Sequence, residues 1–187
     1  MKDNVENLKN FKNDLKILSP IEMFRKYFVD DKCYILDETQ QVKLKSKICD
    51  KFNVQYNNII IVGSGKLGFS IKPDKRFVCF GEESDIDIAI ISTELFVEYW
   101  YRTNKYVEDN ALYKNYEYFC KKLSQNGWLR PDLLPRIDIQ TDWFDFFSEL
   151  TASRAFNNIK LTAGVYYNYH FLEDYQIKCI KNCMETI

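Results

Sequence analysis

Apolar residues recur along this chain with two different periods, which separate the predicted helices from the predicted strands. Helical spacing extends over residues 4–18, 38–52 and 94–125, and a short helix is expected after Ser19-Pro20. Polar pairs at Thr103-Asn104 and Asp109-Asn110 are candidate breaks in the segment at 94–125, which leaves one helix or two helices open there. Two other runs, residues 58–62 and 86–91, are continuous and rich in β-branched side chains, as is typical of buried strands. The polar pair Ser92-Thr93 then predicts the start of the long helix.

The second half of the chain repeats this mixture of elements. Residues 136–139 alternate as a short strand should, residues 142–156 have helical spacing, residues 159–163 predict a last strand, and residues 166–184 predict a final helix. We therefore predict an α/β (α+β) fold, a small mixed β-sheet backed by helices with helical N- and C-terminal additions. Without an internal repeat or low-complexity linker, one domain over residues 1–187 is expected, with a helical layer at 1–55, the sheet at 56–140 and a helical part at 141–187.

Composition narrows the class of protein. With 187 residues, 46% of them hydrophobic, the chain is long enough to bury a core, and a net charge of −1 gives no sign of a surface that coats nucleic acid. No apolar stretch reaches transmembrane length and the first residues lack the apolar centre of a signal peptide, so we expect no membrane partner and a cytoplasmic location. The single histidine, His170, argues against histidine-based zinc sites.

Two aspartates one residue apart give the clearest indication of chemistry. Successive side chains of a strand face opposite sides, so Asp85 and Asp87 share one face while Ile86 and Ile88 point into a core. Magnesium in proteins prefers oxygen ligands, commonly one or two carboxylates completed by substrate phosphates and water. The pair therefore predicts a magnesium site that acts on a phosphate.

A glycine-serine turn lies between the two predicted strands. The first strand stops at Gly63 and Ser64, where backbone N–H groups and a hydroxyl are able to approach a phosphate closely. This turn, followed by Asp85-x-Asp87 on the next strand, resembles the signature of the nucleotidyltransferase superfamily related to DNA polymerase β. The resemblance covers residues 59–92, and the segment between turn and aspartates is longer than is usual in that family.

The resemblance implies an activity and a set of site residues. It implies a nucleotidyltransferase-like fold in which Gly63 and Ser64 bind the triphosphate of an NTP, and Asp85 and Asp87 hold two Mg²⁺ ions. The family carries a third carboxylate on a later strand, for which Asp138 is our candidate, with Asp132, Asp142 and Asp145 nearby. Transfer of a nucleoside monophosphate with release of pyrophosphate is the expected reaction.

The acceptor is left open by the sequence. Small members of this superfamily act on RNA ends, proteins, other nucleotides or small molecules, and some serve as toxins or in antiviral defence. The short chain leaves little room for a separate RNA-binding domain, so a partner protein that supplies the acceptor or controls activity is a reasonable expectation. Cations near the turn would balance a triphosphate; those in this segment are Lys66, Lys72, Lys75 and Arg76.

Two alternative functions follow from the same residues. A catalytically inactive nucleotide-binding or scaffold subunit would keep the fold without the third carboxylate. A P-loop phosphohydrolase is the second alternative, because Gly63, Gly68 and Ser70 match positions of the phosphate-binding loop. Against it, Phe69 stands where the P-loop lysine belongs, and Pro73 disfavours a long helix starting at Gly68.

Overall fold

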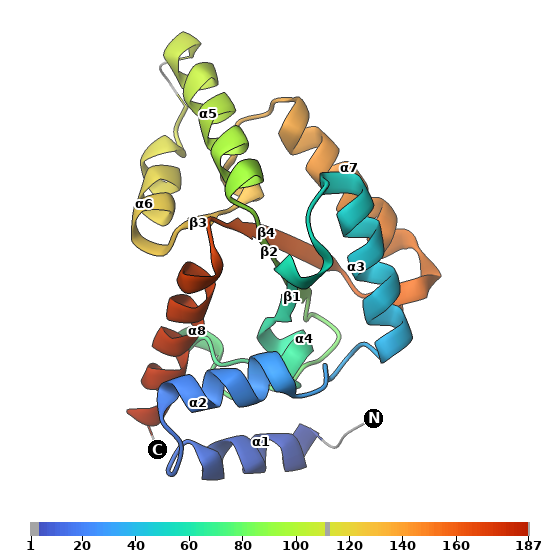
Figure 1. The fold of residues 1–187 in the computed structure, drawn as a ribbon, viewed down its shortest axis with the longest axis vertical. Helices are drawn as coiled ribbons and strands as arrows, with labels where there is room; N and C mark the ends of the chain where they lie inside the picture. Colours follow the sequence, from blue (N-terminus) through green and yellow to red (C-terminus); the bar gives the residue numbers. More distant parts are fainter. Residues whose placement is uncertain (1–3, 111–112, 187) are drawn as a thin grey trace.

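A mixed sheet forms the centre of the molecule and helices cover both of its faces (Figure 1). The computed structural model describes residues 4–110 and 113–186, so the outermost positions of the predicted 1–187 domain, and residues 111–112 of the predicted helix at 94–125, lie outside the described part. The helices and strands in chain order are α1 (Asn4–Asp14), α2 (Pro20–Phe24), the π-helix η1 (Arg25–Asp30), α3 (Glu38–Phe52), β1 (Ile59–Val62), α4 (Gly63–Leu67), β2 (Ile86–Ile91), α5 (Thr93–Asp109), α6 (Tyr116–Asn126), β3 (Trp128–Leu129), α7 (Asp138–Ala152), β4 (Leu161–Tyr166) and α8 (Tyr169–Met184).

The strand order brings together segments that are far apart in the sequence. Within the described residues the sheet has four strands in the order β1-β2-β4-β3. β2 pairs antiparallel with β1, where Val62 lies opposite Asp87, and parallel with β4, where Thr162 lies opposite Asp87. The predicted small mixed sheet backed by helices is confirmed, and so are the two strands predicted around residues 58–62 and 86–91.

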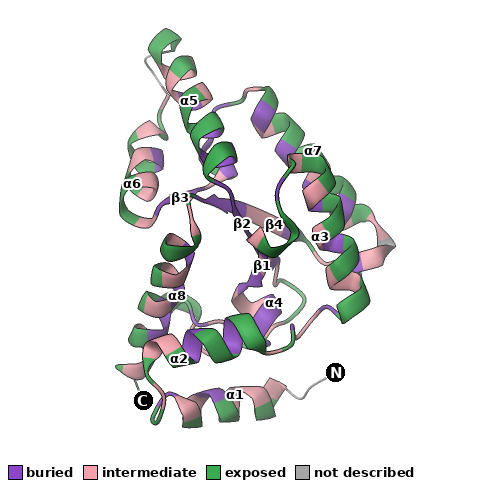
Figure 2. Ribbon diagram, viewed as in Figure 1, coloured by how far each residue is buried: buried purple, intermediate pink, exposed green. Residues whose placement is uncertain are grey.

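β2 is buried on both faces, and the two faces pack against different helices. Ile86, Ile88 and Ile90 are at most 3% exposed and lie in a core built with α3, α5, α6 and α7. Ala89 and Ile91 face the other way, into a core built with α1, α2 and α8. Figure 2 shows the buried positions concentrated on the strands and on the inner sides of the helices. Each buried isoleucine contributes roughly 1.5–3 kcal/mol to folding, which holds the strand in a fixed position.

Capping residues determine where α5 and α3 begin. The Ser92 hydroxyl accepts a hydrogen bond from the backbone N–H of Leu95 at 3.1 Å, so α5 begins directly after β2, as predicted. Asp37 and Gln40 form a reciprocal capping box at the start of α3. The connection after β2 is therefore short and rigid.

The prediction of a strand over residues 136–139 is wrong. Asp138 is instead the first residue of α7, and Ile137 before it has the extended backbone of an N-cap. The buried residues of this helix are Ile139, Trp143, Phe147 and Leu150, which recur with helical spacing. The four-residue alternation was too short to outweigh this longer helical pattern.

None of the helices in the described ranges is long and apolar enough to cross a lipid bilayer.

Candidate active site

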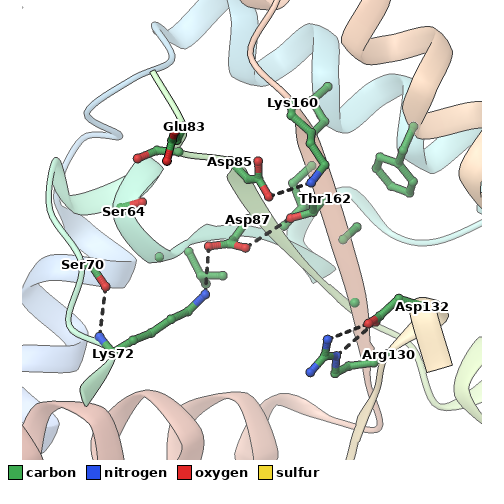
Figure 3. Close-up of a pocket in the computed structure, with 18 of the residues that line it drawn as sticks. Ser64, Ser70, Lys72, Glu83, Asp85, Asp87, Arg130, Asp132, Lys160 and Thr162 are labelled. Atoms are coloured by element: carbon green, nitrogen blue, oxygen red, sulfur yellow. Dashed lines mark hydrogen bonds and ion pairs between the residues drawn. The ribbon is translucent and has the colours of Figure 1, made fainter. Parts of the chain in front are cut away.

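Asp85 directly precedes β2 and Asp87 is the second residue of the strand. Both lie at the N-terminal end of β2, on the floor of a cleft of about 1310 Å³. The face that carries them continues into the apolar core through Ala89 and Ile91, whereas Ile86 and Ile88 point to the opposite core. Figure 3 shows both carboxylates on one side of the strand, directed into the cleft. The predicted placement of the two aspartates on a common face is thus confirmed.

Asp87 has two polar side chains beside its carboxylate. It receives a hydrogen bond from the Thr162 hydroxyl at 3.2 Å, and the Lys72 ammonium lies 3.7 Å from its other oxygen. Burial raises the pKa of Asp87 above its usual value, while Lys72 and Thr162 partly offset that effect. The fold therefore holds this carboxylate in a position where an additional cation would stabilise its charged form.

Asp85 has a lysine partner of its own. The Lys160 ammonium lies 3.1 Å from its Oδ2 atom, and Lys160 directly precedes β4. Both lysines at the pair are open to solvent, with 67% of the Lys160 side chain and 49% of the Lys72 side chain exposed. Flexible exposed lysines are able to leave the carboxylates when another cation arrives.

Only glycine fits at position 63, because the backbone there lies against the Asp87 carboxylate. Its φ angle of +66° lies in the left-handed region, and a Cβ atom placed there would be 2.3 Å from Asp87 Oδ2. Any side chain at this position would collide with the carboxylate. Ser64 follows on the same one-turn helix α4, and both residues line the cleft. The structure therefore brings the predicted turn and the predicted aspartate pair into one site.

The long segment between the turn and the aspartates folds back beside the cleft. Phe69 and Cys79 form an isolated antiparallel bridge, and the Phe77 N–H donates to the Ser70 carbonyl at 2.7 Å. This hairpin-like insertion presents Lys72 and Lys75 to the cleft. Lys66, which the sequence grouped with them, is buried elsewhere and donates to the Asp31 carbonyl oxygen.

Asp138 lies away from the aspartate pair. Thr151, near the other end of α7, accepts a hydrogen bond from the Leu161 N–H next to Lys160, whereas Asp138 begins this 15-residue helix, which is about 22 Å long. The Asp138 carboxylate is paired with Arg102 of α5, and this hydrogen bond lowers its pKa. The prediction that Asp138 is a third carboxylate of the metal site is not supported by this geometry.

The residue beside Asp87 on the neighbouring strand is a threonine, Thr162, and not a carboxylate. β4 is the later strand that pairs with β2, and Thr162 lies opposite Asp87 and bonds to it. Thr162 has no negative charge to offer a metal. The sequence signal for this strand was the apolar run at residues 159–163, which overlaps β4 but does not reveal its partner.

The residues present fit a magnesium ion that shares its ligands with a substrate. Within the described ranges, no group of three or more histidine, cysteine, aspartate or glutamate side chains lies together. Magnesium is commonly held by one or two carboxylates, with substrate phosphates and water supplying the remaining ligands. Asp85 and Asp87 provide that smaller set, and the ammonium groups of Lys160 and Lys72 lie beside them.

The geometry of a P-loop is missing from residues 63–70. A P-loop continues from its second glycine into a long helix. Here α4 begins at Gly63 and ends at Leu67, and the left-handed backbone of Gly68 caps the end of the helix. Phe69 is buried in the core and the chain beyond it is in the hairpin-like insertion.

Sequence reasoning missed the part of the cleft that is lined by Trp128 and Arg130. Trp128 and Arg130 come from β3 and the residue after it, within a segment that was interpreted as a turn-rich connection. The Arg130 guanidinium binds both oxygens of Asp132, at 3.1 and 2.6 Å (Figure 3). Because β3 has only two residues, it leaves no periodic pattern. The available signal was a tryptophan two residues before an arginine, in Trp128-Leu129-Arg130.

Comparisons of the chain with family models, with curated proteins and with solved structures found no match.

Proposed function

We propose that this protein is a magnesium-dependent nucleotidyltransferase that transfers a nucleoside monophosphate from an NTP to an acceptor, with release of pyrophosphate. The observation that carries this proposal is the contact between the Gly63-Ser64 turn and Asp87, on the face of β2 that also presents Asp85 to the cleft. A phosphate-binding turn and a metal-binding pair are then within reach of the same triphosphate.

The residues of the site have separate roles in this proposal. Asp85 and Asp87 hold the metal, which when bound supplies charge neutralisation and alignment for phosphoryl transfer. Thr162 fixes one oxygen of Asp87 and so orients its carboxylate. Ser64 and the ammonium groups of Lys72 and Lys160 bind the β- and γ-phosphates, since the two lysines are exposed and lie at the carboxylates.

The proposal names the acceptor only by its chemical class. An RNA end, a protein, a nucleotide or a small molecule with a free hydroxyl would each suit this reaction, and a partner protein would supply or select it. A cytoplasmic location agrees with the use of NTPs and with the free thiols found at every cysteine of the described chain.

A second candidate function is nucleotide binding without transfer. The observation that favours it is Thr162, which takes the place beside Asp87 where a third carboxylate would accept the proton of the attacking hydroxyl. A scaffold subunit of this kind would bind an NTP and magnesium through Asp85 and Asp87 and release neither pyrophosphate nor phosphate.

Product analysis separates these functions. The protein is incubated with Mg²⁺, NTPs labelled at the α- and γ-phosphates, and pools of RNA or protein acceptors. We expect labelled acceptor and pyrophosphate from the wild type and no product from the Asp85→Asn/Asp87→Asn variant. Asp74→Asn is the matched control, because Asp74 is an exposed aspartate of the same insertion that does not line the cleft.

Each product pattern identifies one function. Equal pyrophosphate release by the wild type and the double variant would contradict the assigned site. Tight NTP binding without any product would support the scaffold, and release of inorganic phosphate would support a phosphohydrolase.

A further inference from the structure

An aromatic wall borders the cleft beside the aspartate pair. Trp128 of β3 and Tyr166 of β4 have nearly parallel rings, with centroids 5.9 Å apart and an interplanar angle of 4°. Tyr175 of α8 lies 5.5 Å from Trp128, and all three side chains line the cleft. Aromatic surfaces of this kind bind nucleobases by stacking, with little dependence on which base is present.

Gly164 sets the distance between this wall and the metal-binding carboxylates. A Cβ atom built on Gly164 would lie 2.2 Å from Trp128 Nε1, so only glycine allows the indole to rest against β4. Thr162, which bonds to Asp87, is two residues earlier on the same strand, about 6.6 Å away. Trp128 is therefore separated from the carboxylates by a gap that suits the sugar between a phosphate and a base.

Gln176 adds an unpaired amide to the same wall. Its side chain comes from α8, lines the cleft and is only 4% exposed. The amide makes no hydrogen bond with residues 4–110 and 113–186, and its atoms are not among the fully enclosed unpaired atoms of these residues, so they are open to the cleft. A side-chain amide offers a donor and an acceptor side by side, so it is ready to bind a ligand with the complementary pair.

The charges around the wall favour a neutral ligand group. Arg130 and Asp132 bind each other through two hydrogen bonds, and the Arg130 guanidinium also lies 5.5 Å from the Trp128 ring centroid. Their charges are thus largely matched, and the polar groups of the wall that lack a hydrogen-bond partner among the described residues are both neutral: the Gln176 amide and the buried Trp128 Nε1–H. Adenine presents an acceptor at N7 beside a donor at N6, which complements an amide; guanine presents two acceptors on that edge.

We propose that Trp128, Tyr166, Tyr175 and Gln176 form the base-binding part of the site, and that it prefers adenine. This inference rests on the proposed function, since it places the triphosphate at Asp85 and Asp87. The base stacks on Trp128 and Gln176 reads its edge. The preferred donor substrate is then ATP.

Calorimetry with three probes tests the base site separately from the phosphate site. The probes are non-hydrolysable ATP and GTP analogues and tripolyphosphate, each with Mg²⁺. We expect the wild type to prefer the ATP analogue by about tenfold, as one good bidentate contact allows. Gln176→Met should reduce this preference to within about twofold without weakening tripolyphosphate binding, because the amide contacts only the base.

A second variant tests stacking. Trp128→Leu should weaken both nucleotide analogues by about tenfold and leave tripolyphosphate unaffected. The matched controls are Gln125→Met and Trp100→Leu, which change exposed residues outside the cleft and should leave all three probes unaffected. If Trp128→Leu does not fold, Trp128→Phe keeps a stacking ring. Nucleotide should then quench tryptophan fluorescence in the wild type and in Trp100→Phe but far less in Trp128→Phe, because the other tryptophan that lines the cleft, Trp143, is only 2% exposed.

The outcomes distinguish failure of the base site from failure of the function. If tripolyphosphate binds but the Gln176 and Trp128 variants behave as the wild type, the base site is overturned and the proposed function stands. An unchanged fluorescence response in Trp128→Phe has the same meaning. If neither nucleotide nor tripolyphosphate binds with Mg²⁺, both proposals are overturned.

Discussion

Two segments of this chain contain the same tripeptide in different structures. Ile86-Asp87-Ile88 lies in β2, at the floor of the cleft, while Ile137-Asp138-Ile139 starts α7 on the outside of the molecule. In both segments an isoleucine is buried, but Asp87 faces a cleft between elements and 68% of the Asp138 side chain is exposed. Identical neighbours in sequence therefore do not give an aspartate the same role.

The surroundings give the two carboxylates opposite electrostatic properties. Burial raises the pKa of Asp87, whereas the hydrogen bond from Arg102 lowers the pKa of Asp138. Asp138 already has a strong cationic partner, while Asp87 has only a lysine at 3.7 Å and a threonine hydroxyl. The comparison teaches that the aspartate whose charge is poorly satisfied by the protein is the one available to a ligand.

The largest expected effect concerns activity. Asp87→Asn should lower nucleotidyl transfer at least about 100-fold, because a metal ligand contributes several kcal/mol to the transition state. Asp138→Asn, the same chemical change in the same tripeptide, should retain activity within about twofold. Initial rates of pyrophosphate release measure both variants, and an equal loss in Asp138→Asn would break the comparison.

Gly63→Ala tests how closely Asp87 is held. The alanine must adopt a positive φ angle and its Cβ would meet Asp87 Oδ2, so the free energy of unfolding should fall by about 1–3 kcal/mol. Chemical denaturation measures the loss. In the Asp87→Ala background the same substitution should be less damaging, because the clash is absent; equal losses in both backgrounds would show that the close contact does not exist.

The difference in stability between Asp87→Asn and the wild type should depend on pH. A raised pKa means that the folded protein binds the Asp87 proton more tightly than the unfolded chain does. Wild-type stability therefore falls as the pH rises from the ordinary pKa toward the raised pKa of the folded protein. At pH 7 the asparagine variant should be more stable by about 1 kcal/mol, as is common when a functional group is removed. Denaturation at several pH values should show the gain disappearing below the ordinary value of 3.8. A variant less stable than wild type at pH 7 would contradict this account.

Asp138→Asn should show the smallest effect, with the opposite sign. Because the pKa of Asp138 is lowered, its ionised carboxylate stabilises the fold at pH values above the ordinary aspartate pKa of 3.8. This contribution is lost as the pH falls through the pKa of the folded protein. The variant should therefore be slightly less stable than wild type at pH 7, and added salt should reduce the difference because the pair is exposed. Thermal melts with Arg102→Met as a second variant check this; additive losses in the double variant would exclude the pair.

The sequence was informative where pattern and chemistry coincide on one element. The apolar run with two aspartates predicted β2 and the shared face of Asp85 and Asp87, and the glycine-serine turn was placed correctly beside them. These features depend on residues that are close along the chain or on the period of a strand.

The remaining site residues depend on pairing across the chain. Lys160 and Thr162 reach Asp85 and Asp87 because β4 lies parallel to β2, with each bonded pair 75 residues apart. Short local alternation predicted the wrong structure for residues 136–139, because burial of Trp143 and Phe147 on α7 favours the helix. No local pattern encodes which strand becomes the neighbour of another.

The central claim is that Asp85 and Asp87 together bind a metal ion with a nucleotide. Electron paramagnetic resonance with Mn²⁺ in place of Mg²⁺, recorded with a non-hydrolysable ATP analogue, tests it most directly. We predict protein-bound Mn²⁺ whose binding requires the nucleotide, is lost in Asp87→Asn and is unchanged in Asp138→Asn. Retention of the bound Mn²⁺ in Asp87→Asn, or its loss in Asp138→Asn, would contradict the account.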